Sequence, residues 1–173
     1  MTTRWLGIAG VVILLLLASW ADRRRDPLSQ NEIDQLRDAA QEPEQRLKLF
    51  LAFARARLTA LEQAHSDPKT TDRAQKTHDA LQDFVDIYDE LNDNLDTFVG
   101  RKADLRKPLK LVILADNEFQ ARLRIVKGDS RAPESAQYEF LLNTALDAVH
   151  SSLEDHRQLL AEQEEAARHR KKD

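Results

Sequence analysis

Apolar residues recur at intervals of three and four positions along most of the chain, which is the period of an amphipathic α-helix. The segment 43–65 shows the pattern most clearly. Its apolar face consists of Leu47, Phe50, Leu51, Ala54, Leu58 and Leu61. The same period continues through about 71–99, 102–127 and 134–168, with polar loops between them. The pattern therefore predicts four long helices.

Capping and proline signals predict where helices begin. Ser29 and Glu32 match a capping box, in which the two side chains satisfy backbone N–H groups at the helix start. A short helix should therefore run from Ser29 to about Gln41. Pro43 follows, and proline is favoured in a first helical turn. Pro108 must start or kink its helix, because the residue before proline resists the α conformation.

Short links between long amphipathic helices make neighbouring helices antiparallel. Gly100 and Gly128 follow the last apolar positions of their segments, where a left-handed residue would end a helix. We therefore expect an all-α protein, an antiparallel up-down bundle of four long helices plus one short N-terminal helix. This bundle should occupy residues 29–168, and residues 169–173 should form a charged C-terminal tail.

Charge predicts which helices are neighbours. Residues 71–99 hold eight acids against two bases, whereas residues 101–127 hold eight bases against three acids. Adjacent helices of opposite sign attract each other. These two helices are therefore expected to pack side by side.

The N-terminus differs from the rest of the chain. The 17 residues from Trp5 to Ala21 are uncharged and strongly apolar. Small side chains at Ser19 and Ala21 suit a signal peptidase, which would cleave between Ala21 and Asp22. The run also reaches the lower limit of about 17–25 residues for a membrane-spanning helix. Residues 1–21 are thus a signal peptide or a membrane anchor.

A basic linker, residues 22–28, follows this segment. Its arginines, Arg23, Arg24 and Arg25, oppose translocation, because basic residues beyond an apolar run tend to stay cytoplasmic. The prediction is nevertheless an exported protein, periplasmic or secreted. The alternative is a single-pass inner-membrane anchor, in which residues 5–21 contact the membrane.

Composition excludes several classes of function. The chain has no Cys, which rules out disulfides, thiolate zinc sites and cysteine nucleophiles. Only four Gly are present, and no Gly-rich phosphate loop or nucleophile elbow occurs. The net charge of −4 argues against nucleic-acid binding. No catalytic residue and no cofactor are predicted.

A metal centre is the one chemical site that the residue spacing suggests. Glu62 and His65 lie one helical turn apart, as do Asp147 and His150. The Glu-x-x-His pattern serves di-iron bundles, which also need inward carboxylates from the other helices. Here the inward positions of 81–98 are apolar, so both histidines are interpreted as surface or boundary residues.

Five acids in the segment 71–99 follow a 4-3-4-3 spacing and should form one stripe on a helix face. They are Asp79, Asp83, Asp86, Glu90 and Asp93. The stripe is interpreted either as a solvated face or as a docking surface for a cationic partner. A straight helix cannot supply the six to eight converging oxygens that calcium needs.

Asp116 lies near the apolar face of its helix. A buried carboxylate needs a hydrogen-bonding partner, and Arg55 or Arg57 would be suitable. Partial exposure of Asp116 is the expectation.

Two short motifs on the predicted helix 43–65 are Glu42-Pro43-Glu44-x-Arg46 and Phe53-Ala54-x-x-Arg57-Leu58. Over about 25 of the 173 residues, this stretch resembles a helix found in exported bacterial helical domains of unknown function. The resemblance implies a periplasmic or secreted setting and transfers no catalytic residue.

The leading hypothesis is therefore an exported or membrane-tethered helical bundle that acts by protein–protein contact, with an unidentified partner and an undetermined oligomeric state. A metal-binding, di-iron-like bundle is the first alternative. The second alternative is a carrier of a lipid or small ligand. Its cavity would be lined by Leu49, Phe50, Phe53, Phe84, Tyr88 and Phe119.

Overall fold

A computed structural model describes residues 26–67, 69, 71–129 and 133–170. These residues form five α-helices and one short 3-10 helix, and no strand occurs among them. The predicted all-α fold is confirmed at this level. The predicted cleavage site between Ala21 and Asp22, and the whole segment 1–25, lie outside the described residues.

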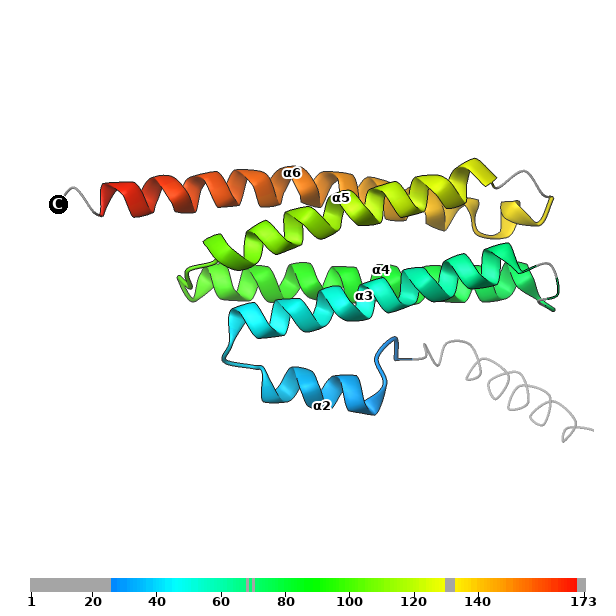
Figure 1. The fold of residues 1–173 in the computed structure, drawn as a ribbon, viewed down its shortest axis with the longest axis horizontal. Helices are drawn as coiled ribbons and strands as arrows, with labels where there is room; N and C mark the ends of the chain where they lie inside the picture. Colours follow the sequence, from blue (N-terminus) through cyan, green and yellow to red (C-terminus); the bar gives the residue numbers. More distant parts are fainter. Residues whose placement is uncertain (1–25, 68, 70, 130–132, 171–173) are drawn as a thin grey trace, which may run out of the picture.

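Four long helices lie together along the long axis of the molecule, and one short helix lies on their side (Figure 1). In chain order, the elements are α2 (Gln30–Asp38), α3 (Pro43–Ser66), α4 (Arg73–Gly100), α5 (Arg106–Asp129), η2 (Pro133–Gln137) and α6 (Glu139–His169). Their number and order match the prediction of four long helices preceded by a short one.

The short helix α2 begins with the predicted capping box. The backbone N–H of Ser29 donates to Glu32 Oε2 at 2.7 Å, and the N–H of Glu32 donates to Ser29 Oγ at 3.4 Å. Glu32 also accepts two hydrogen bonds from the Arg57 guanidinium of α3, at 3.0 and 2.7 Å. Only Leu36 in α2 and the adjoining Ala39 are buried there. Among the described elements, α2 therefore rests on α3 alone.

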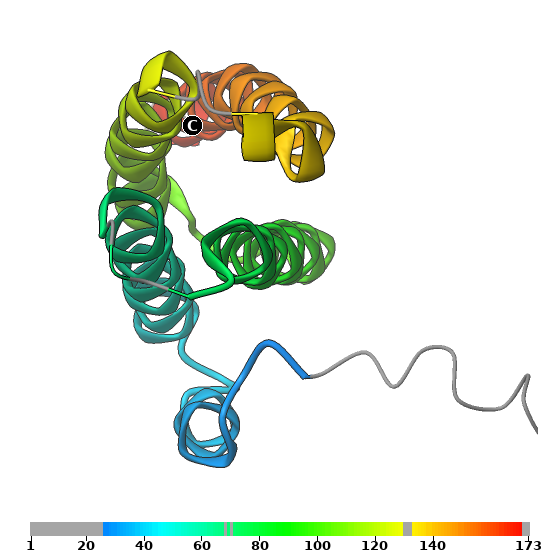
Figure 2. The same ribbon diagram turned by 90° about the vertical axis from the view of Figure 1, so that its right-hand side faces the viewer.

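The long helices form a four-cornered arrangement. In this bundle α3 contacts α4 and α5, and α6 contacts α5 and α4. The view along the bundle shows α4, in green, and α5, in yellow-green, at opposite corners (Figure 2). The prediction that the acidic and basic helices are neighbours is therefore wrong. Exposed ion pairs contribute only about 0.2–1 kcal/mol each, so apolar burial decides which helices pack together.

The bases of α5 pair instead with the helices on either side of it. Lys107 Nζ lies 2.9 Å from Glu44 of α3. Lys110 Nζ lies 3.0 Å from Glu164 of α6. Charge complementarity thus exists in the bundle, but it joins α5 to α3 and α6.

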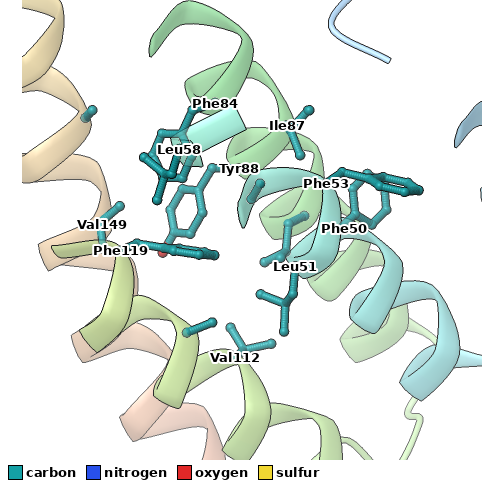
Figure 3. Close-up of a cluster of buried hydrophobic side chains, with 14 of the residues drawn as sticks. Phe50, Leu51, Phe53, Leu58, Phe84, Ile87, Tyr88, Val112, Phe119 and Val149 are labelled. Atoms are coloured by element: carbon teal, nitrogen blue, oxygen red, sulfur yellow. The ribbon is translucent and has the colours of Figure 1, made fainter. Parts of the chain in front are cut away.

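The core is a continuous apolar cluster running through the four long helices. At its centre, Phe84 and Tyr88 of α4 meet Phe119 of α5 across the diagonal (Figure 3). The ring centroids lie 5.4 Å apart for Phe84 and Phe119 and 6.1 Å apart for Tyr88 and Phe119. Edge-to-face contacts of this kind fill the space that a four-cornered bundle leaves at its centre.

Several predicted helix ends are corrected by the structure. Gly100 and Gly128 are helical residues, and neither has a positive φ. Lys102 takes the left-handed conformation after α4, with φ 58°. Pro108 falls in the first turn of α5, where its missing N–H costs no intrahelical hydrogen bond.

The last predicted helix is divided in two. The 3-10 helix η2 is followed by Tyr138, whose φ of −126° lies outside the α region, and α6 starts only at Glu139. The Tyr138 side chain at this break is buried. At its other end α6 continues to His169, and Gln163 there accepts a hydrogen bond from the Leu105 N–H at 2.8 Å.

Candidate functional site

The predicted stripe of acids lies on the outer side of α4. Asp79, Glu90 and Asp93 are exposed, and Asp83 and Asp86 are partly buried. Sequence reasoning missed one member, Asp89, which is also exposed. We call these six residues of α4 the acidic face.

Asp89 could have been found from its spacing, because it follows Asp86 by three positions and precedes Asp93 by four. Partial burial raises the pKa of Asp89, and the charges of Asp86 and Asp93 raise it further. Like charges at this spacing on a helix repel one another. Asp89 therefore lies in a locally negative potential.

The acidic face has both charged and neutral neighbours, and Arg46 of α3 interacts electrostatically with Glu90. Neutral amides donate to two of its carboxylates, Gln75 to Asp79 and Gln82 to Asp86, each at 2.8 Å. His78 Nδ1 lies 3.7 Å from Asp79. Amide donors satisfy carboxylate oxygens without neutralising them. The face can thus attract a cationic surface from solution.

The four metal candidates do not converge. Glu62 receives two hydrogen bonds from Arg122 of α5, at 2.7 and 2.8 Å. His65 Nδ1 lies 3.3 Å from the Tyr138 hydroxyl. Within the described ranges, no group of three or more His, Asp or Glu side chains is positioned to hold a metal ion.

The second candidate pair, Asp147 and His150, lies on the exposed side of α6. His150 Nδ1 is 3.3 Å from Gln120 Nε2 of α5. His65 and His150 thus each lie beside a neutral polar side chain. The metal hypothesis stays a prediction without a shared site to carry it.

A polar cluster that the sequence did not reveal lies inside the bundle. Asp116 of α5 is completely buried. Its Oδ1 accepts a hydrogen bond from the Tyr88 hydroxyl of α4 at 2.8 Å, and its Oδ2 lies 2.8 Å from His156 Nδ1 of α6. We call Tyr88, Asp116 and His156 the central cluster. It joins three of the four long helices at one carboxylate.

The expectation that Asp116 is partly exposed is wrong, and so are its suggested partners. Arg55 donates to Glu118 at 2.8 Å, and Arg57 donates to Glu32 of α2. The missed signal was His156, which follows the buried residue Leu153 by three positions. An inward histidine at this spacing is a suitable partner for an inward aspartate.

The central cluster has a polar extension between α4 and α6. Asn92 Nδ2 of α4 donates to Ser152 Oγ of α6 at 3.1 Å. Burial raises the pKa of Tyr88 well above its usual value, and the charge of Asp116 raises it further. The phenol therefore stays protonated and continues to donate. Asp116 has no exposed surface, and its hydrogen bonds hold α4, α5 and α6 together.

The residues expected to line a ligand cavity are mostly core residues. Phe50, Phe84, Tyr88 and Phe119 are at most 1% exposed, and three of the four rings contact one another. Phe53 is nearly buried, whereas Leu49 is only partly buried. The carrier hypothesis stays a prediction, and the rings of Phe84, Tyr88 and Phe119 pack together at the centre of the bundle.

Two further findings concern the chain as a whole. Among the helices of the described residues, none has an apolar stretch long enough to cross a membrane. Comparisons with protein-family models, with curated proteins and with solved structures found no match.

Proposed function

We propose that this protein is an exported or membrane-tethered helical bundle that acts by protein–protein contact through the acidic face of α4. The observation that carries the proposal is the crowding of carboxylates around Asp89, whose pKa is raised by partial burial and by the charges of Asp86 and Asp93. Such crowding destabilises an isolated helix. A partner that supplies cations would relieve the repulsion.

The proposed partner is a protein segment rich in Lys or Arg. Charge complementarity of this kind speeds the encounter and selects the partner, and salt weakens it. Asp86 is partly buried, and Asp89 and Asp93 are exposed. Together these three acids span about two turns of α4, which suits a basic helix or an extended basic strand.

The proposed architecture is an antiparallel up-down bundle. Where α5 and α6 are joined by hydrogen bonds and ion pairs, the residue numbers rise along α5 as they fall along α6. The pairs are Lys110–Glu164, Asn117–Arg157 and Gln120–His150. Between α3 and α5 the residue numbers of the partners rise together, as in the ion pairs Glu44–Lys107 and Glu62–Arg122. Both patterns support alternating helix directions.

The proposed location rests on the apolar run from Trp5 to Ala21. Sequencing the N-terminus of the mature protein, together with cell fractionation, tests it. A start at Asp22 in a soluble envelope fraction indicates export, and an intact Met1 in the membrane indicates a tether. An intact Met1 in the cytosol contradicts both.

The interaction is tested by removing charge from the acidic face. The triple variant D86N/D89N/D93N is compared with wild type and with D155N/E162Q/E165Q, which removes three exposed charges from α6 instead. Each protein is used for pull-down from an envelope extract, and complexes are sized by light scattering after size exclusion. We expect the partner to be lost only from the α4 variant. Equal capture by all three proteins, or a strict monomer without a partner, contradicts the proposal.

A further inference from the structure

A cleft of about 480 Å³ lies at the end of the bundle where α5 begins and α6 ends. Six charged side chains line it. They are the cations Arg106, Lys107, Lys110 and Arg168 and the carboxylates Asp104 and Glu164. The cleft thus has more cations than anions.

A second cavity, of about 780 Å³, adjoins the first and shares Asp104 and Arg106 with it. It adds two further bases, Lys102 and Arg170, and no further carboxylate. The excess of positive charge therefore extends around this end of the bundle. It is separate from the acidic face, which occupies the outer side of α4.

Both carboxylates of the cleft experience this positive field. Hydrogen bonds from Arg106 lower the pKa of Asp104 to about 2. A hydrogen bond from Lys110 lowers the pKa of Glu164, and the charges of Lys110, Arg168 and Arg106 lower it further. These shifts are opposite in sign to that of Asp89 in the acidic face.

The backbone adds to the field. The N-terminal end of a helix carries a partial positive charge, and acids are the residues that it favours. The first turn of α5 has none, and instead begins with Arg106 and Lys107. This placement is unfavourable for the isolated helix. Asp104, two residues before Arg106, accepts a hydrogen bond from the Arg106 N–H at 3.2 Å and offsets part of this positive potential.

Enough donors remain in the cleft for an added anion. Arg106 uses Nε and Nη2 on Asp104, which leaves Nη1 available. Lys110 holds one contact to Glu164, and an ammonium group has three N–H donors. Arg168 is 76% exposed and lies 3.9 Å from Glu164, beyond hydrogen-bond distance. Two guanidinium groups and an ammonium group are the donor set that a phosphate group prefers.

We propose that this cleft binds a phosphate group, carried either by free phosphate or by the headgroup of an anionic lipid. The phosphate oxygens accept from Arg106, Lys110 and Arg168, and the N-terminus of α5 adds its dipole. The grouping of Arg106, Lys110 and Arg168 at this end of the bundle has an explanation in this role, whereas Lys107 pairs with Glu44 of α3.

The test compares R106Q/K110Q with R124Q/K127Q, which removes the same charge from exposed positions at the far end of α5. The full chain is titrated with inorganic phosphate by calorimetry. In a second arm, it is sedimented with phosphatidylcholine vesicles with and without phosphatidylglycerol, and the increment due to the anionic lipid is measured. We expect R106Q/K110Q to weaken binding at least about tenfold and the control to retain it within about twofold.

The outcomes separate the two sources of phosphate. If the wild-type protein binds inorganic phosphate and R106Q/K110Q does not, the result supports the proposal, with free phosphate as a sufficient ligand. If binding is found only as an increase with vesicles that contain phosphatidylglycerol, the result supports the proposal with a lipid headgroup as the source of the phosphate. R168Q is a second variant, because this exposed side chain can be changed without disturbing the start of α5. The absence of binding in both arms, or an equal loss in R124Q/K127Q, overturns the proposal.

Discussion

Two clusters of polar side chains connect helices in this protein. The central cluster joins α4, α5 and α6 through Tyr88, Asp116 and His156. A surface cluster joins α3 to α5 on the outside of the bundle. It consists of Arg55, Glu62, Glu118 and Arg122, with contacts of 2.7 to 3.4 Å.

Both clusters bind carboxylates at similar distances, but their donors differ, and so does their burial. Asp116 has no exposed surface, whereas the side chains of Glu62 and Glu118 are 40% and 37% exposed. Water can replace a lost partner on the surface but not at the centre. A distance alone therefore says little about how much an interaction stabilises the fold.

The largest effect is expected at the centre. Replacing Asp116 by Ala leaves the Tyr88 hydroxyl and the His156 ring buried without their acceptor. We expect D116A to lower the free energy of unfolding by about 3 kcal/mol, measured by urea denaturation at neutral pH.

A matched variant shows whether the unpaired polar groups cause that loss. Y88F/D116L/H156L replaces all three polar groups by apolar side chains of similar size, and should recover stability to within about 1 kcal/mol of wild type. If D116A costs less than about 1 kcal/mol, or the triple variant is no better than D116A, the central cluster does not have the role assigned here.

The second effect is smaller and depends on pH. Hydrogen bonds from Arg122 hold the pKa of Glu62 below its ordinary value of 4.5. Since the folded pKa is the lower one, the stabilisation is present above pH 4.5 and is lost as the pH falls through the folded pKa. We expect E62Q to cost less than about 1 kcal/mol at pH 7.

Urea denaturation of E62Q and wild type at pH 7 and at pH 3 tests this expectation. The difference between the two proteins should shrink in acid and in high salt. The control is E154Q, which removes an exposed acid paired with Arg157 within one helix. A cost that persists unchanged at pH 3 contradicts the assignment of this stabilisation to the ion pair.

The smallest effect has the opposite sign. Burial and the charges of Asp86 and Asp93 raise the pKa of Asp89, so the ionised form is disfavoured in the folded protein. That penalty is present above the raised pKa and disappears as the pH falls through it. We expect D89N to stabilise the protein by a few tenths of a kcal/mol at pH 7 and by less in acid. Thermal unfolding of D89N and wild type at pH 7 and in acid measures this difference in stability. A D89N variant that is less stable than wild type contradicts the crowding of charge.

Local signals were enough to predict most of the helices. The capping box of Ser29 and Glu32 and the proline at Pro43 mark starts that the structure confirms. Helix ends were predicted less well. Gly100 is a helical residue without a positive φ, and Lys102 takes the left-handed conformation instead.

Contacts between distant helices could not be predicted from periodicity or charge. Tyr88 and Asp116 are 28 positions apart, and Asp116 and His156 are 40 apart. The sequence shows that each faces inward, but which inward groups meet depends on how the four helices are arranged. The same arrangement places α4 and α5 on a diagonal of the bundle, where they meet through core side chains although their charges are complementary.

The carboxylate of Glu32 links the folding of α2 to the packing of this helix against α3. Glu32 completes the cap of this helix and also holds it against Arg57. A helix of nine residues does not persist in water without tertiary contacts, so a detached α2 loses its helical hydrogen bonds as well. Its amide protons should consequently exchange with solvent together, as one foldon whose opening free energy lies below that of the four-helix core.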